Sequence, residues 1–141
     1  MKVFLDTSSL VKLYHKEEGT DELLAFLAEG VYEIWLSELT MLEFRSALWK
    51  KVRTGELGKN AAVRVMNCFN NDHDKFRWVH LELPITRIAL STIMKYGAKG
   101  LRTLDSIQLA CALFLEAEDL ICLTSDKLLK SFFQLENLET I

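Results

Sequence analysis

The chain has 141 residues, of which half are hydrophobic and about a quarter are charged, with one proline and six glycines. This length suffices for a buried core, and we expect a single domain over residues 1–141. The composition excludes a disordered or low-complexity chain. The net charge of −3 is mild evidence against a nucleic-acid-binding protein, because most such proteins are basic.

The three cysteines, Cys68, Cys111 and Cys122, are widely spaced and form no CxxC pair. They indicate neither a zinc site nor a disulfide framework, and we expect small buried side chains in a protein of the reducing cytoplasm. Asp6 interrupts the first apolar run, so we expect no secretory signal. The longest apolar stretch, residues 109–115, is far shorter than the roughly 20 residues of a membrane span, so no membrane association is expected.

In the first half of the chain, apolar runs typical of strands alternate with helical patterns. The pattern predicts, in chain order, a strand, two helices, a strand and two helices: residues 2–5, 6–14, 19–30, 32–36, 37–53 and 59–70. Ser37 is expected to cap the helix that reaches about Arg53, because serine commonly accepts a hydrogen bond at a helix start. Glycines interrupt the chain after this helix, at Gly55 and Gly58.

The second half continues the alternation. It predicts a strand, a helix, a glycine-containing loop, a helix, a strand, a helix and an edge strand: residues 76–83, 84–96, 97–100, 104–116, 120–123, 125–133 and 138–141. The helix over residues 104–116 is apolar nearly all round, so we expect it to be buried at the centre of the molecule. Strands alternating with helices predict a three-layer α/β/α sandwich with a mostly parallel central sheet.

Four acidic residues fall where such a fold forms its sites. Asp6 directly follows the first strand, and Asp126 follows the strand over residues 120–123 by a short turn. In parallel sheets, ligands bind beyond the carboxyl ends of the strands. Asp105 lies in the first turn of its helix, and Glu43 lies on an apolar helix face, where a lone carboxylate is costly. Each residue alone fits a helix cap or a solvated position, but together they can converge on one sheet edge.

Four motifs around these acids resemble those of PIN domains, in the family's order and over almost the whole chain. They are Phe4–Leu10, Ser37–Leu48, Leu104–Ala110 and Leu123–Leu129, and each contains one of the acids. The short single-domain form resembles the VapC toxins, which are the ribonuclease partners of toxin–antitoxin pairs. The resemblance therefore implies a PIN-like fold and an endoribonuclease.

Clustered carboxylates are hard oxygen ligands that suit one or two Mg²⁺ or Mn²⁺ ions. Such ions lower the pKa of a bound water and neutralise charge on a phosphodiester. We expect Asp6 and Asp105 to be direct ligands and Glu43 to bind directly or through water. Asp126 would support a second ion or orient the attacking water. Hydroxyl groups beside the acids could fix the carboxylates, although each also fits a helix cap. These residues are Thr7, Ser8, Thr124 and Ser125.

The resemblance also implies cleavage of single-stranded or loop RNA with 3′-hydroxyl and 5′-phosphate products, a homodimer, and an antitoxin protein as partner. Lys95, Lys99 and Arg102 lie in and beside the loop before Asp105. Each fits a solvated loop position, but together they would place positive charge where the RNA backbone must run. We therefore predict that these three residues bind RNA.

Two other enzyme classes fit the sequence less well. A haloacid-dehalogenase-type phosphatase needs a second aspartate two residues after the first, where this chain has Ser8. A receiver domain has an acidic pair after its first strand and an aspartate after its third, where this chain has Leu83 and Pro84. A third alternative is a catalytically silent PIN-like binding module that acts through a protein partner.

Overall fold

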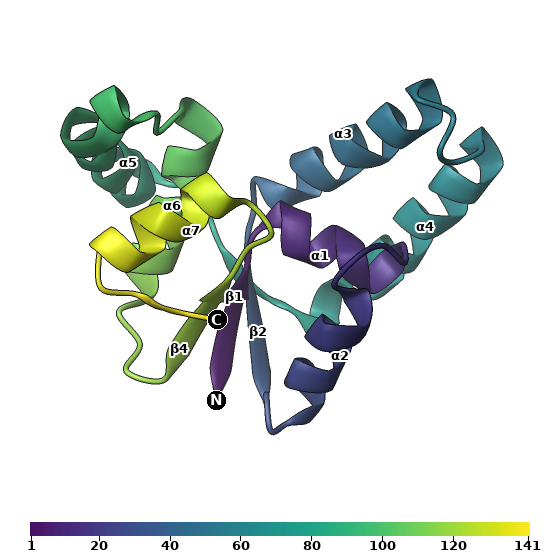
Figure 1. The fold of residues 1–141 in the computed structure, drawn as a ribbon, viewed down its shortest axis with the longest axis horizontal. Helices are drawn as coiled ribbons and strands as arrows, with labels where there is room; N and C mark the ends of the chain where they lie inside the picture. Colours follow the sequence, from purple (N-terminus) through teal and green to yellow (C-terminus); the bar gives the residue numbers. More distant parts are fainter.

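The computed structural model describes residues 1–141. Five strands form its central sheet, all parallel, in the order β3-β2-β1-β4-β5 (Figure 1). The strands are β1 (Lys2–Leu5), β2 (Glu33–Ser37), β3 (Arg77–Val79), β4 (Leu120–Leu123) and β5 (Glu139–Thr140). The predicted α/β fold with a mostly parallel sheet is confirmed.

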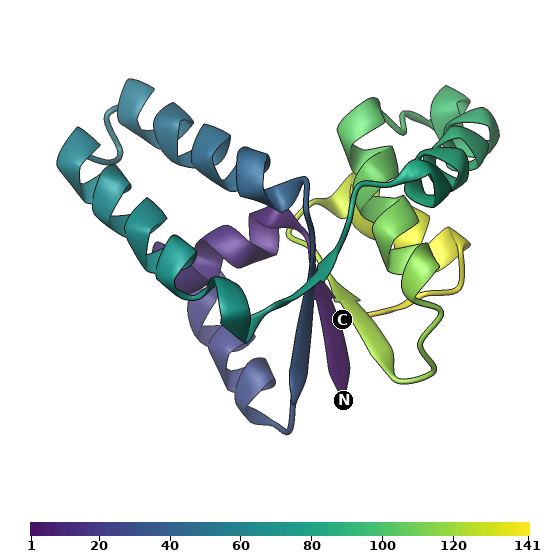
Figure 2. The ribbon, with the colours of Figure 1, turned by 180° about the vertical axis from the view of Figure 1, so that it is seen from behind.

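Seven helices cover the two faces of the sheet, which makes three layers (Figures 1 and 2). One face carries α1 (Thr7–Tyr14), α2 (Thr20–Ala28), α3 (Thr40–Arg53) and α4 (Lys59–Asn71). The other face carries α5 (Leu83–Tyr96), α6 (Thr103–Leu115) and α7 (Lys127–Leu135). Two short 3₁₀ helices, η1 (His73–Lys75) and η2 (Gly97–Lys99), complete the elements.

Strand β1 lies at the centre of the sheet and separates two hydrophobic cores. Val3 and Leu5 pack on the side of α1, α3 and α4, whereas Phe4 packs on the side of α5, α6 and α7. All three side chains are fully buried. A strand covered on both faces needs a continuous apolar run, which explains the sequence between Lys2 and Asp6. Asp6 is therefore held at the carboxyl edge by the central strand of the sheet.

The structure moves several of the predicted boundaries by one or two residues and two of them by more, and the predicted loop over residues 97–100 contains the 3₁₀ helix η2. Ser37 does not cap α3 but is the last residue of β2, and its Oγ accepts a hydrogen bond from the Leu39 amide at 3.1 Å. A serine hydroxyl can close a strand-to-helix turn as readily as it caps a helix, so the position of Ser37 in the sequence does not distinguish a turn from a cap. The strand predicted over residues 76–83 contains only Arg77–Val79, because residues 80–82 form an exposed connection and Leu83 already begins α5.

Helix α6 is buried only in its middle. Residues 108–112 are buried, whereas Leu104 and Phe114 near its two ends are each 49% exposed. The expectation that α6 lies wholly inside is therefore too broad, since residues at both of its ends are exposed. No helix of the structure has the length and apolar character needed to cross a membrane.

Candidate active site

Asp6 is the most buried of the four acids, with 5% of its surface exposed. It is the N-cap of α1, where its Oδ1 accepts the Ser9 amide at 2.9 Å. Ser8 Oγ lies 2.7 and 2.9 Å from the two carboxylate oxygens, and Thr124 donates to Oδ2 at 2.6 Å. Burial outweighs these hydrogen bonds, and with the nearby charge of Glu43 it raises the pKa of Asp6 to about 6.

Glu43 projects from the first turn of α3 and is held by side chains from two other helices. Its Oε1 accepts hydrogen bonds from Thr7 Oγ1 at 3.0 Å and from Gln108 Nε2 at 2.8 Å. Thr40 completes this network, because its hydroxyl lies 3.1 Å from both Thr7 Oγ1 and Gln108 Nε2. The other oxygen, Oε2, has no hydrogen-bond partner and stays available to a ligand.

Asp105 and Asp126 are less enclosed. The Asp105 carboxylate makes no hydrogen bond, and its pKa is raised by partial burial, then by the charges of Asp126 and Glu43, against the lowering effect of Arg102. Asp126 is exposed and caps α7, where its Oδ1 accepts the amides of Leu128 at 2.8 Å and Leu129 at 3.0 Å. Both acids therefore keep carboxylate oxygens without a donor.

The charges link the four acids into one set. Glu43 raises the pKa of both Asp6 and Asp105, and Asp126 raises that of Asp105. No three His, Cys, Asp or Glu side chains converge closely enough to hold a metal ion together in the geometry of the structure. The four acids nevertheless place several negative charges near one another, with carboxylate oxygens that accept no hydrogen bond. Oxygen ligands of this kind fit a divalent cation.

The hydroxyl residues expected beside the acids have different contacts. Thr7 donates to Glu43, whereas Ser8 and Thr124 hold Asp6. The side chain of Ser125 makes no hydrogen bond, although its backbone amide donates to Ser8 Oγ at 2.9 Å. Three of these four residues thus contact a candidate carboxylate directly.

The three cations expected to bind RNA differ in their contacts. Lys95 forms an ion pair at 2.9 Å with Glu136, the residue that follows α7, and lies over the ring of Tyr96, so its ammonium is already engaged. Lys99 lies over the same ring at 6.0 Å. Arg102 is exposed and close enough to Asp105 to lower its pKa. Of the three, only Arg102 has a resolved interaction with a candidate acid.

Two polar residues of the site were not predicted from the sequence. Gln108 lies in the middle of the apolar helix α6 with 2% of its surface exposed, and Thr40 is fully buried at the start of α3. A single glutamine in an otherwise apolar helix is the one signal that pointed inward. Its carboxamide oxygen, Oε1, is buried without any partner. A carboxylate only accepts hydrogen bonds, so the amide nitrogen of Gln108 must face Glu43 and the amide oxygen must point away from it.

Several solved structures share the fold of this chain. The chain resembles the solved structure of Mycobacterium tuberculosis VapC20, a sarcin–ricin loop cleaving toxin (TM-score 0.70, 14% identity, covering 92% of this chain and 94% of that chain). It also resembles VapBC2 from Rickettsia felis bound to promoter DNA (0.67, 18%, covering 100% and 98%). FitAcB from Neisseria gonorrhoeae is a third neighbour (0.68, 16%, covering 99% and 96%).

These identities are low, so the structural likeness shows the fold. No curated protein is significantly similar to the chain in sequence. The sequence model of the PIN domain, however, matches residues 3–132, which include all four acids. The chain belongs to the PIN domain family.

Proposed function

We propose that the chain is an Mg²⁺- or Mn²⁺-dependent endoribonuclease that cleaves single-stranded or loop RNA, and that it is the toxin of a toxin–antitoxin pair. One observation carries the proposal: carboxylates from distant segments lie close together, since the charge of Glu43 raises the pKa of both Asp6 and Asp105, and the charge of Asp126 raises that of Asp105. Membership of the PIN domain family supports it. The structural neighbours, which include a toxin named for cleaving an RNA loop and complexes named VapBC, support it further.

Asp6 and Asp105 would hold one cation, with Glu43 binding directly or through water. Asp126 would support a second ion or orient the attacking water. When bound, such a cation lowers the pKa of a water molecule and neutralises charge on the phosphodiester. The products would carry a 3′-hydroxyl and a 5′-phosphate.

The chain's own residues hold these carboxylates in position. Ser8 and the Ser9 amide donate to Oδ1 of Asp6 and Thr124 donates to Oδ2, so hydrogen bonds on both oxygens fix the orientation of this carboxylate. Thr7 and Gln108 fix one oxygen of Glu43 and leave the other free. Donors that orient a ligating carboxylate in this way commonly raise metal affinity or activity 10- to 100-fold, as an order of magnitude.

The test is cleavage of a mixed RNA pool by the pure protein with Mg²⁺, Mn²⁺ or a chelator. We expect cleavage only with the metal, and its loss in Asp6→Asn and in Asp105→Asn. Asp74→Asn is the matched control, because Asp74 is an exposed aspartate outside the site and should keep full activity. Full activity in a purified Asp6→Asn protein would contradict the mechanism. Metal-independent partner binding without cleavage would instead favour the silent binding module.

The proposed partner is an antitoxin that places an arginine or lysine against the acidic site. A charge-assisted hydrogen bond to a carboxylate is strong, and the free oxygens of Asp105 and Asp126 would accept it. Expression of the chain alone should stop growth, and co-expression of the small protein encoded beside it should restore growth. If Asp105→Asn stops growth as well as the parent does, the toxicity comes from elsewhere.

A further inference from the structure

A cleft of about 340 Å³ extends from the candidate site along α3. Thr7, Ser8 and Glu43 line its acidic end, and Lys50 and Arg53 line it together with Ser46. Positions 43, 46, 50 and 53 are spaced by three or four residues, so they form one stripe on the helix surface. With a rise of about 1.5 Å per residue, Lys50 and Arg53 lie roughly 10 and 15 Å along the helix axis from Glu43.

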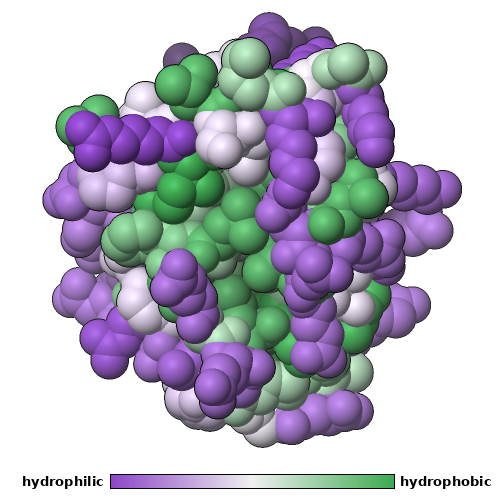
Figure 3. All heavy atoms as spheres, turned by 90° about the vertical axis from the view of Figure 1, so that its left-hand side faces the viewer, coloured by the Kyte–Doolittle hydropathy of each residue, from purple (hydrophilic) through white to green (hydrophobic).

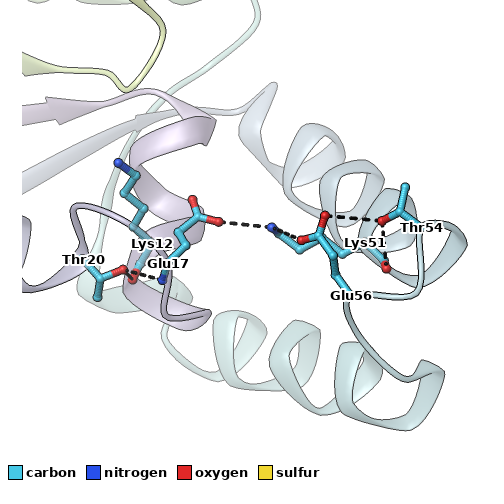
Figure 4. Close-up of polar contacts among 6 residues, drawn as sticks. All are labelled: Lys12, Glu17, Thr20, Lys51, Thr54 and Glu56. Carbon is cyan, nitrogen blue, oxygen red and sulfur yellow. Dashed lines mark hydrogen bonds and ion pairs between the residues drawn. The ribbon is translucent and has the colours of Figure 1, made fainter.

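Lys50 and Arg53 differ from their neighbour Lys51 in what they contact. The Lys51 ammonium reaches Glu17 at 3.1 Å and Glu56 at 3.3 Å and is only 16% exposed, so it ties α3 to the α1–α2 connection (Figure 4). Lys50 and Arg53 are exposed and form no ion pair. Two uncompensated cations therefore face the cleft, whereas the adjacent lysine is held by two carboxylates.

We propose that Lys50 and Arg53 bind backbone phosphates of a single RNA strand, next to the phosphate that is cleaved at the four acids. The inference rests on the proposed function and adds the path of the substrate. Both cations are too far along α3 to neutralise charge on the cleaved phosphate itself, but they suit the phosphates of neighbouring nucleotides. Such contacts position the strand without reading its sequence. They are separate from Lys99 and Arg102, which precede α6.

The test is the affinity for a labelled single-stranded RNA as a function of potassium chloride, measured without divalent ions. The background is Asp6→Asn, Asp105→Asn, which prevents cleavage and removes part of the negative charge. Adding Lys50→Ala and Arg53→Ala should make the log–log salt slope shallower by about 1.4, since each contact to a single strand contributes about 0.7. The matched control, Lys59→Ala with Arg64→Ala, removes two exposed cations of α4 that do not line the cleft and should leave the slope unchanged.

The outcomes separate this inference from the proposed function. If the background protein binds RNA and the double variant of α3 has the same slope, the inference is wrong and the ribonuclease proposal stands. If the background protein shows no salt-dependent binding of RNA at all, the proposed function fails and the inference fails with it. An equal loss of slope in the α4 control would assign the effect to net charge, which also overturns the inference.

Discussion

Asp6 combines two properties that oppose each other, because it is a buried carboxylate that must be charged to bind a cation. Its pKa is raised from 3.8 to about 6, mainly by burial. The folded state therefore binds this proton more tightly than the unfolded state does. Below about pH 4, Asp6 is protonated in both the folded and the unfolded state, and its contribution to stability is fully present. As the pH rises through about 6, the folded carboxyl ionises, and the free energy of unfolding falls by about 3 kcal/mol.

The first prediction follows from this sign. In the metal-free protein, Asp6→Asn should increase the free energy of unfolding at about pH 8 and change it little at about pH 4, because asparagine keeps the helix cap without the charge. Urea unfolding of parent and variant at the two pH values, with a chelator present, measures the difference. An equal gain at both values would assign the effect to packing and not to ionisation.

Gln108 positions Glu43, and its effect on stability can be measured separately from its effect on metal binding. Gln108→Leu removes the hydrogen bond to Glu43, but it also removes the buried and unpaired Oε1, which costs about 1–3 kcal/mol. We expect the free energy of unfolding to change by less than about 1 kcal/mol. Affinity for Mg²⁺ or Mn²⁺ should fall about 10-fold or more, because Glu43 loses one of its two donors.

Calorimetric titration of Mn²⁺ and urea unfolding measure the two effects of Gln108→Leu. Gln134→Leu on α7 is the matched control, since Gln134 is exposed and makes no hydrogen bond to the site. Unchanged metal affinity in Gln108→Leu would show that the network around Glu43 serves packing alone.

At the scale of the element, Asp126 has a role in α7 as well as in the candidate site. Its cap bonds to Leu128 and Leu129 satisfy amides that would otherwise lack a partner. Asp126→Ala should therefore lower the free energy of unfolding by about 1 kcal/mol, whereas Asp126→Asn should change it by only a few tenths, because asparagine caps as well. If the charge matters for cleavage, both variants should lose activity.

Thermal or urea unfolding of the Asp126 variants, alongside RNA cleavage, distinguishes the two roles. Asp126→Asn retaining full activity would restrict this residue to capping. A loss of stability in Asp126→Asn as large as in Asp126→Ala would contradict the cap assignment itself.

At the scale of the whole molecule, an apolar patch surrounded by charged side chains lies on the face that α5 helps to form (Figure 3). Leu90 is 62% exposed and Met94 is 80% exposed, one turn apart on α5. A groove between α5 and α6 adds Ile93 and Ile107 to the apolar surface beside them. Contiguous apolar surface of this kind marks interaction sites, and it supports the expected homodimer.

The last prediction tests this face. Leu90→Lys with Met94→Lys should convert a dimer to a monomer in sedimentation velocity, because burying two lysines between identical faces is costly. The monomer should keep the far-UV circular dichroism spectrum of the parent, since both side chains are exposed and not part of a core. Leu24→Lys, at an exposed leucine of α2, is the control that should leave the dimer intact. A parent that is monomeric throughout would contradict the expectation.

The sequence by itself determined the order and type of the elements, because their signals are local. The continuous apolar run before Asp6 indicates a strand buried on both faces, and the longer apolar run of residues 104–116 indicates a helix. It also placed the four acids beside strand ends and helix starts, which motif spacing makes visible. The sequence did not determine where each element begins and ends. The hydroxyl of Ser37, for example, fits a turn and a helix cap equally well.

Only the tertiary structure decided which side chains act together. Gln108 reads as one polar residue in an apolar helix until packing brings it to Glu43, 65 positions away. Lys95 reads as a free cation until Glu136, 41 positions away, pairs with it. Lys50 and Lys51 are indistinguishable as neighbours in the chain, and the fold alone gives one of them two carboxylate partners. The physical reason is the same in each case: hydrogen bonds and ion pairs between distant segments depend on packing and leave no periodic pattern in the sequence.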